Sequence, residues 1–92
     1  MDGKSYKLVV LPSGFVYIGR LHRTDGIWLR LTDAVSVRRW NNGSGIPGVC
    51  HSPTSVTVDG KDHRMEMDFP IHSLISVHAI DMENWSAVLG DE

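Results

Sequence analysis

Short runs of β-branched and aliphatic residues, separated by glycine and proline turn signals, most restrict how this chain can fold. Residues 6–11 form the first run, and Pro12-Ser13-Gly14 ends it. Asp25-Gly26 is a strong hairpin signal between a second run and a third. Runs this short, each closed by a tight turn, predict an all-β antiparallel fold.

The same pattern sets the expected boundaries. Strands are expected over 6–11, 15–22, 27–31, 35–40, 63–71 and 74–80, with a possible short strand over 54–58. A glycine inside a strand marks a bend or a close backbone approach, so Gly19 predicts one there, and Thr32-Asp33-Ala34 predicts a kink. No helix is expected before residue 82, and residues 82–89 are expected to form one or two helical turns.

Composition places the chain among small globular domains. It has 92 residues, of which 41% are hydrophobic and 22% charged, and this indicates a single domain over 1–92 with a variable loop at 41–63 and a C-terminal tail at 82–92. No apolar run reaches the roughly 18 residues of a membrane-spanning helix. The polar start lacks the apolar core of a secretory signal, and Cys50 is the only cysteine. We therefore expect a cytoplasmic protein, in the host cytoplasm if the chain is viral.

Charge disfavours one class of partner. The net charge is −2, and a chain with that balance is not held to long nucleic acid by bulk attraction. The distribution is uneven, because residues 1–40 hold seven basic and three acidic side chains while residues 41–92 hold two and eight. Such asymmetry indicates either a basic binding face or pairing between the two halves in the fold.

Two stretches resemble the Sm-like family, which includes the bacterial Sm-like RNA chaperone. Leu11-x-x-Gly14-x-x-Tyr17-x-Gly19-x-Leu21-x-x-x-Asp25, continued by Leu29-x-Leu31 and Ala34, is similar to its first motif. Residues 71–77 are similar to the short loop and last strand of its second motif. The resemblance implies a five-stranded bent antiparallel barrel, with an extended loop between strands 3 and 4. It also implies a homo-oligomeric ring, in which the fourth and fifth strands pair with neighbouring copies.

The resemblance carries a second implication, about RNA. In the family, a loop after the second strand and a loop before the last strand contact bases around the pore. The matching positions here are Asp25, with Trp28 nearby, and His72. The asparagine that the family places after that aspartate is absent, and so is the Arg-Gly pair of the second motif. Read without the resemblance, Asp25 is a turn former and His72 a polar turn residue.

Another candidate site lies at the end of the strand over 35–40. Arg38 and Arg39 match phosphate oxygens, Trp40 offers a ring for stacking, and Asn41 and Asn42 offer amides for base edges. An Arg-Arg-Trp strand end before a glycine-rich loop also resembles small phage-encoded proteins, some of which bind nucleotide immune signals. The alternative is a strand end with solvated arginines and a tryptophan that covers the barrel mouth.

Catalysis and metal binding find little support in the sequence. Adjacent Cys50 and His51 rarely present sulfur and imidazole to each other, and no third orienting group is evident. The five histidines lack the spacing of a known metal site, and no glycine loop leads into a helix as in common nucleotide cofactor sites. We therefore expect no enzyme, no metal and no cofactor.

The function expected from the sequence is non-catalytic binding of a nucleotide-type ligand by a homo-oligomer. A phage protein that sequesters a nucleotide immune signal is its concrete form, with Arg38 and Arg39 on phosphate. One alternative is an Sm-like ring that binds RNA through Asp25, Trp28 and His72. The other alternative is a ring or scaffold protein without a small ligand.

Overall fold

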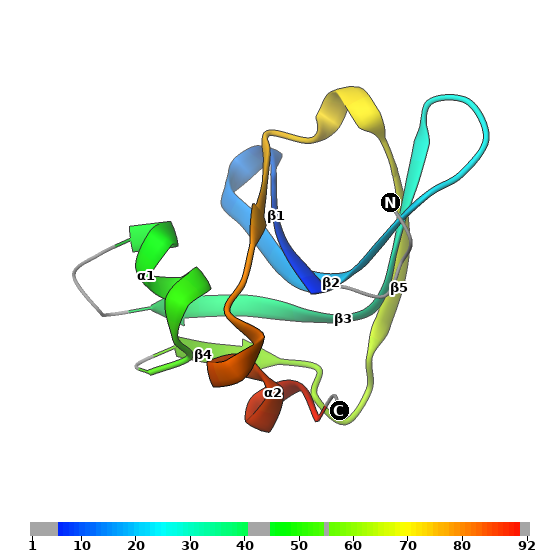
Figure 1. The fold of residues 1–92 in the computed structure, drawn as a ribbon. Helices are drawn as coiled ribbons and strands as arrows, with labels where there is room; N and C mark the ends of the chain where they lie inside the picture. Colours follow the sequence, from blue (N-terminus) through cyan, green and yellow to red (C-terminus); the bar gives the residue numbers. More distant parts are fainter. Residues whose placement is uncertain (1–5, 41–44, 55, 91–92) are drawn as a thin grey trace.

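A computed structural model describes residues 6–40, 45–54 and 56–90 (Figure 1). The strands are β1 (Tyr6–Leu11), β2 (Phe15–Arg23), β3 (Trp28–Trp40), β4 (Val56–Asp59), β5 (Met65–Pro70) and β6 (Ser76–Ala79). Two short 3-10 turns, η1 (Pro12–Gly14) and η2 (Ile71–Ser73), follow β1 and β5. The helices are α1 (Gly45–His51) and α2 (Met82–Leu89).

The six strands form one curved antiparallel sheet (Figure 1). Their order is β4-β3-β2-β1-β6, and β5 also pairs with β3. The all-β antiparallel prediction is confirmed, including the short strand near 54–58. The five-stranded barrel differs in two respects: there are six strands, and within the described residues no pairing joins β5 to β6 to close the sheet.

Strand β3 organises the sheet because it pairs along both of its edges. One edge pairs with β2, and the other edge is divided between β5 and β4. Residues 28–34 pair with β5, and residues 36–40 pair with β4. The sequence predicted two strands joined by a kink; the structure joins them into one strand, with Asp33 at φ 52° where the partner changes.

The bend in β3 is possible because Gly19 lies against it. The register between β2 and β3 shifts between Ile18 and Arg20. A Cβ atom on Gly19 would lie 2.8 Å from Leu31 Cγ and 2.9 Å from the Thr32 carbonyl oxygen. Real Cβ atoms do not approach so closely, so the predicted close backbone approach at Gly19 is confirmed.

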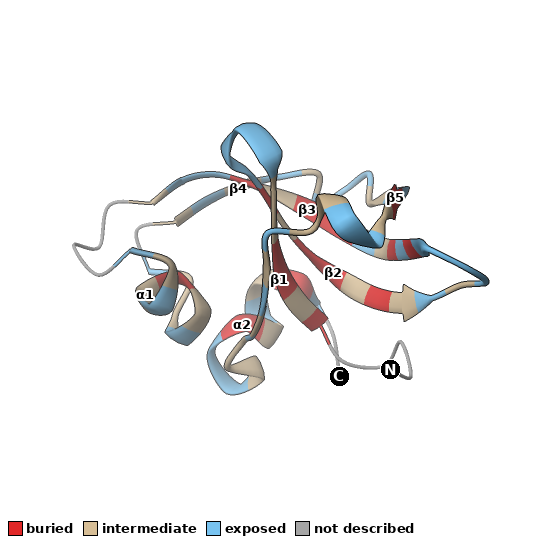
Figure 2. Cartoon of the chain, turned by 90° about the horizontal axis from the view of Figure 1, so that it is seen from above, coloured by how far each residue is buried: buried red, intermediate tan, exposed pale blue. Residues whose placement is uncertain are grey.

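The sheet is buried on both faces (Figure 2). In β1, Leu8 belongs to one hydrophobic cluster and the next residue, Val9, to the other, since successive side chains point to opposite faces. The helix-side cluster joins the sheet to α1 and α2; its members are Tyr6, Leu8, Val16, Ile18, Val35, Val37, Val49, Trp85 and Leu89. The strand-side cluster lies inside the curve of the sheet; its members are Val9, Leu21, Leu29, Leu31, Ala34 and Phe69.

Helix α1 corrects the prediction that residues 41–63 form a variable loop and that no helix precedes residue 82. Its sequence, GIPGVCH, contains two glycines and a proline and has poor helix propensity. Its stability therefore comes from tertiary contacts: Val49 is fully buried in the helix-side cluster, and α2 binds the end of α1.

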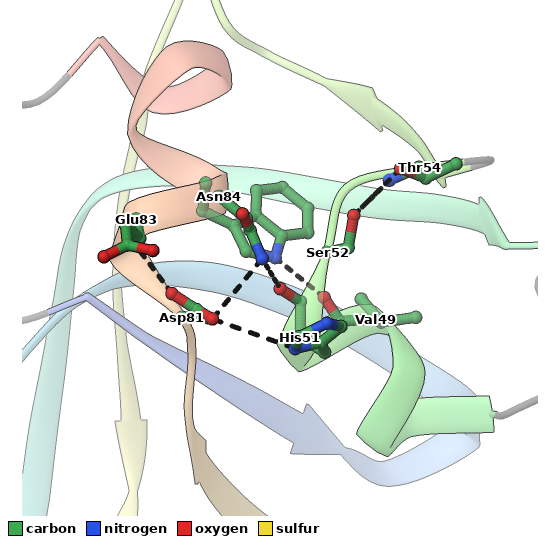
Figure 3. Close-up of polar contacts among 8 residues, drawn as sticks. Val49, His51, Ser52, Thr54, Asp81, Glu83 and Asn84 are labelled. Atoms are coloured by element: carbon green, nitrogen blue, oxygen red, sulfur yellow. Dashed lines mark hydrogen bonds and ion pairs between the residues drawn. The ribbon is translucent and has the colours of Figure 1, made fainter.

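Helix α2 satisfies the last carbonyl groups of α1 (Figure 3). A helix leaves its final carbonyls without partners inside the helix, so something else must bind them. Three successive carbonyls accept hydrogen bonds: Val49 from Trp85 Nε1 at 2.7 Å, Cys50 from the Asp81 N–H at 2.8 Å and His51 from Asn84 Nδ2 at 2.7 Å.

The helical turns predicted near residue 82 are confirmed as α2. The Asp81 carboxylate caps the helix by accepting from the Glu83 N–H at 3.0 Å, and Gly90 ends it at φ 69°. Trp85 is fully buried, so this segment is part of the core rather than a tail.

Arg64, in the connection between β4 and β5, ties α2 to the bend in β3. Its Nη2 donates to the Leu89 carbonyl at the end of α2 at 2.5 Å. Its Nη1 donates to the Asp33 carbonyl at 3.2 Å. One guanidinium thus binds two segments that lie far apart in the sequence.

Substituting Gly19→Ala should lower the free energy of unfolding by about 1–3 kcal/mol, because the added methyl must displace the backbone of β3. The measurement is chemical denaturation followed by tryptophan fluorescence. Arg23→Ala, at the exposed end of the same strand, is the control and should stay within about 0.5 kcal/mol of wild type. Equal stability of the two variants would show that β2 and β3 are not in close contact at Gly19.

Substituting Trp85→Phe should lower the free energy of unfolding by about 1–3 kcal/mol, because the Val49 carbonyl loses its buried donor. It should also speed amide hydrogen exchange in α1. Asn84→Ala removes an equally short bond at an exposed position and should cost less. If exchange in α1 is unchanged in the Trp85 variant, α2 does not stabilise α1.

Candidate ligand-binding site

A β-bulge at Arg38 shapes the candidate site at the end of β3. Val37 pairs with Val58, but Arg39 pairs with Thr57, so β3 carries one extra residue between those pairs. Strict alternation would turn one of two adjacent arginines toward the core. A bulge re-aims side chains, and here both Arg38 and Arg39 are exposed.

The two arginines line one surface depression of about 330 Å³ together with Thr57 and Asp59, both on β4. Arg38 Nη1 contacts Asp59 Oδ2 at 2.5 Å, with more than half of each side chain exposed to solvent. Arg39 has no hydrogen-bond or ion-pair partner among the residues described. The arrangement offers guanidinium donors to an anion, and it places one carboxylate in competition with that anion.

The other predicted members of this cluster separate from the arginines. Trp40 is half-buried and packs against the helix-side cluster, on the opposite face of β3. Asn41 and Asn42 lie outside the described residues. The structure therefore brings together Arg38 and Arg39 of the predicted five-residue cluster.

The residues predicted to contact RNA lie at the other end of β3. Asp25 and Trp28 line a depression of about 490 Å³ with Thr24 and Asp68. Trp28 is 48% exposed. The turn between β2 and β3 closes through Thr24, whose N–H and hydroxyl both donate to the Trp28 carbonyl.

His72 comes near this end because η2 contacts the same turn. The Ile71 N–H donates to the Ile27 carbonyl at 2.6 Å, and Trp28 pairs with Pro70. The imidazole of His72 is exposed, and within the described residues it makes no hydrogen bond with Asp25 or Trp28. The loops that carry Asp25 and His72 are thus adjacent. They lie at the opposite end of the 13-residue strand β3 from Arg38 and Arg39.

An ion pair borders the Trp28 depression. Arg30 donates to both carboxylate oxygens of Asp68, from Nε at 2.8 Å and from Nη2 at 3.2 Å. These hydrogen bonds hold the pKa of Asp68 below its ordinary value, and the same contact raises the pKa of Arg30. Asp68 is therefore a fixed negative charge beside Trp28 at neutral pH.

The Cys50-His51 pair shows no catalytic geometry. Cys50 is half-buried, and burial raises the pKa of its thiol, which disfavours the reactive thiolate. His51 Nδ1 lies 3.8 Å from Asp81 Oδ2, and that carboxylate already caps α2 (Figure 3). Across 6–40, 45–54 and 56–90, no group of three or more His, Cys, Asp or Glu side chains is placed to hold a metal ion.

One feature of the Arg38 region has no signal in the sequence. A further depression of about 350 Å³ is lined by residues 13–17 and 36–38, and Arg38 borders it as well as the first depression. Phe15 and Tyr17 lie in it. Alternation in the strand expected over 15–22 gives no sign that the face with Phe15 and Tyr17 is open there.

Comparison of the chain with protein-family models, with curated proteins and with solved structures finds no match. No helix among the described residues has the length and hydrophobicity needed to cross a membrane. Functional inference therefore depends on the geometry and charge of the sites themselves.

Substituting Arg30→Ala should raise the pKa of Asp68 toward its ordinary value of about 3.9. In the wild-type protein the pair stabilises the fold above that pH, and this stabilisation disappears as pH falls through the lowered pKa of Asp68. NMR titration of the side-chain carboxyl carbons measures the shift. An unchanged pKa of Asp68 in the variant would mean that Arg30 does not bind it in solution.

Proposed function

We propose that this chain is a non-catalytic, homo-oligomeric binding protein that holds a nucleotide-type ligand by its phosphate at Arg38 and Arg39. The observation that carries the proposal is the β-bulge, which exposes both guanidinium groups on one depression. Planar guanidinium groups bind phosphate oxygens bidentately, so two neighbouring ones favour a phosphate over a neutral ligand. A site built from two neighbouring arginines is also compatible with a net charge of −2, because it depends on local charge and not on the charge of the whole chain.

The contact between Arg38 and Asp59 makes the proposed site distinctive. Asp59 Oδ2 contacts Arg38 Nη1, so an incoming phosphate competes with this carboxylate for the guanidinium. Exposed ion pairs of this kind contribute little to stability, so the displacement costs little. Asp59 thus limits the affinity of the site without blocking it.

The free strand edges support the oligomeric part of the proposal. In the described part of the chain, β5 pairs only with β3 and β6 only with β1, so each leaves one edge open. Ile75, just before β6, and Val77, within β6, are exposed. Leu21, Leu29 and neighbouring residues line an apolar hollow of about 230 Å³. Exposed edges and apolar surface are typical of interfaces between copies, as the Sm-like resemblance also implies.

A viral protein that sequesters a nucleotide immune signal is the biological role we propose for such a binder. Sequestration needs affinity and slow release, and it needs no group that acts on the bound molecule.

RNA binding by a ring is the second candidate, and one observation favours it. The turn that carries Asp25 and Trp28 contacts η2, which carries His72, so the three residues come from adjacent loops. An exposed tryptophan is a stacking surface for a base. Asp25 opposes it, because it adds a negative charge beside that ring, whereas the charge of Asp68 is balanced by Arg30.

The test is a binding panel read by calorimetry and native mass spectrometry. We expect an assembly larger than a monomer that binds mononucleotides or a cyclic dinucleotide. Arg39→Ala should weaken binding about tenfold or more, since hydrogen bonds to charged groups are the strong ones. Asp59→Asn should tighten binding severalfold, because it removes the internal competitor for Arg38.

Arg30→Ala is the matched control, because it removes an exposed, ion-paired arginine at the opposite end of the same strand. It should leave nucleotide affinity unchanged. Binding of a uridine oligonucleotide that is lost in Trp28→Ala and kept in Arg39→Ala would replace the proposal with the RNA alternative. A monomer would contradict the assembly, and no binding of any probe would leave a scaffold role.

A further inference from the structure

Strands β2 and β3 separate at one end, although both continue. Their pairing stops at Tyr17 opposite Ser36. Beyond that pair, Phe15 and Val16 pair with β1 on their other side, while residues 37–40 pair with β4. Continued by two residues, the register would bring Phe15 opposite Arg38. A fork takes the place of that pairing, and the fork is the depression lined by residues 13–17 and 36–38.

At the fork, backbone groups of β2 leave the β2–β3 ladder. In an antiparallel pair, every second residue directs its N–H and C=O toward the neighbouring strand. Of Phe15 and Val16, one therefore directs both groups toward β3, where the β2–β3 ladder no longer pairs them. Ser36 and Tyr17, which lie opposite each other on one face, both line the depression.

An aromatic surface lies on the same face of the fork. Phe15 is 57% exposed, which is unusual for so large an apolar side chain in a strand. Its ring is nearly parallel to that of Tyr17, with an interplanar angle of 14° and centroids 6.5 Å apart. Tyr17 packs against the strand-side cluster and so holds its own ring in place. Any nucleobase can stack on such an aromatic surface, because stacking uses the flat face that every base has.

Arg38 joins this surface to the arginine pair. It borders the fork and also the depression of Arg39, Thr57 and Asp59. The order along the surface is therefore aromatic rings, then Arg38, then Arg39. A nucleotide has the same order, since its base and its phosphate lie at opposite ends of the sugar.

We propose that the fork between β2 and β3 is the base-binding half of the nucleotide site, with the base stacked on Phe15 and its edge toward the parted strands. This rests on the proposed phosphate role of Arg38 and Arg39. The hollow of about 350 Å³ is at the small end of ligand pockets, which fits a single nucleotide unit. The stacking role passes to Phe15 because Trp40 packs against the opposite face of the sheet.

The experiment compares AMP, GMP, CMP and UMP with ribose 5-phosphate, which carries the phosphate without a base. Wild-type protein should bind at least one mononucleotide about tenfold more tightly than ribose 5-phosphate, the gain expected for one stacked base. Phe15→Ala should abolish that difference and leave the affinity for ribose 5-phosphate unchanged. Arg39→Ala should weaken both kinds of probe.

Trp28→Ala, which removes a comparably exposed aromatic ring at the other end of β3, is the control and should keep the difference. NMR gives a readout without mutation: amides of residues 15–17 and 36–38 should shift with the nucleotide and stay in place with ribose 5-phosphate. If ribose 5-phosphate binds as tightly as every nucleotide, the base site is wrong and the phosphate site stands. If neither these probes nor a cyclic dinucleotide binds, both proposals are wrong.

Discussion

The close contact between Gly19 and the bend of β3 is the constraint on which the rest of the fold depends. A strand of 13 residues that stayed straight would present one long edge to a single partner. Because β3 bends where Gly19 lacks a side chain, its outer edge faces two directions. β5 pairs with the first part and β4 with the second, and the sheet curves around the strand-side cluster.

The same strand separates the two candidate surfaces. One end of β3 carries Trp28 beside fixed carboxylates, and the other end carries Arg38 and Arg39. A chain with a basic first half and an acidic second half can retain a local site for an anion if the two halves do not pair every arginine. Two arginines of the first half, Arg30 and Arg38, form ion pairs with Asp68 and Asp59 of the second half, while Arg39 has no partner among the described residues.

The sequence predicted most of the sheet because its strands and turns follow local rules: alternation, Asp25-Gly26 and the kink at Asp33. Helix α1 could not be predicted, since its residues are poor helix formers and its carbonyls depend on α2, some thirty residues away. The bulge at Arg38 was equally hidden: two adjacent arginines fit ordinary alternation as well as a bulge. The fork at Phe15 depends on where two ladders end, which is a property of the assembled sheet.

Arg64 affects how the protein unfolds. Its side chain links the carbonyl at the end of α2 to the carbonyl at the bend of β3. The last helix covers one face of the sheet, and the bend sets the curvature around the other. If the last turn of α2 unfolds, Arg64 loses one of its two anchors and holds the bend of β3 less firmly. The two faces of the sheet are therefore linked through one side chain, in addition to the strands that they share.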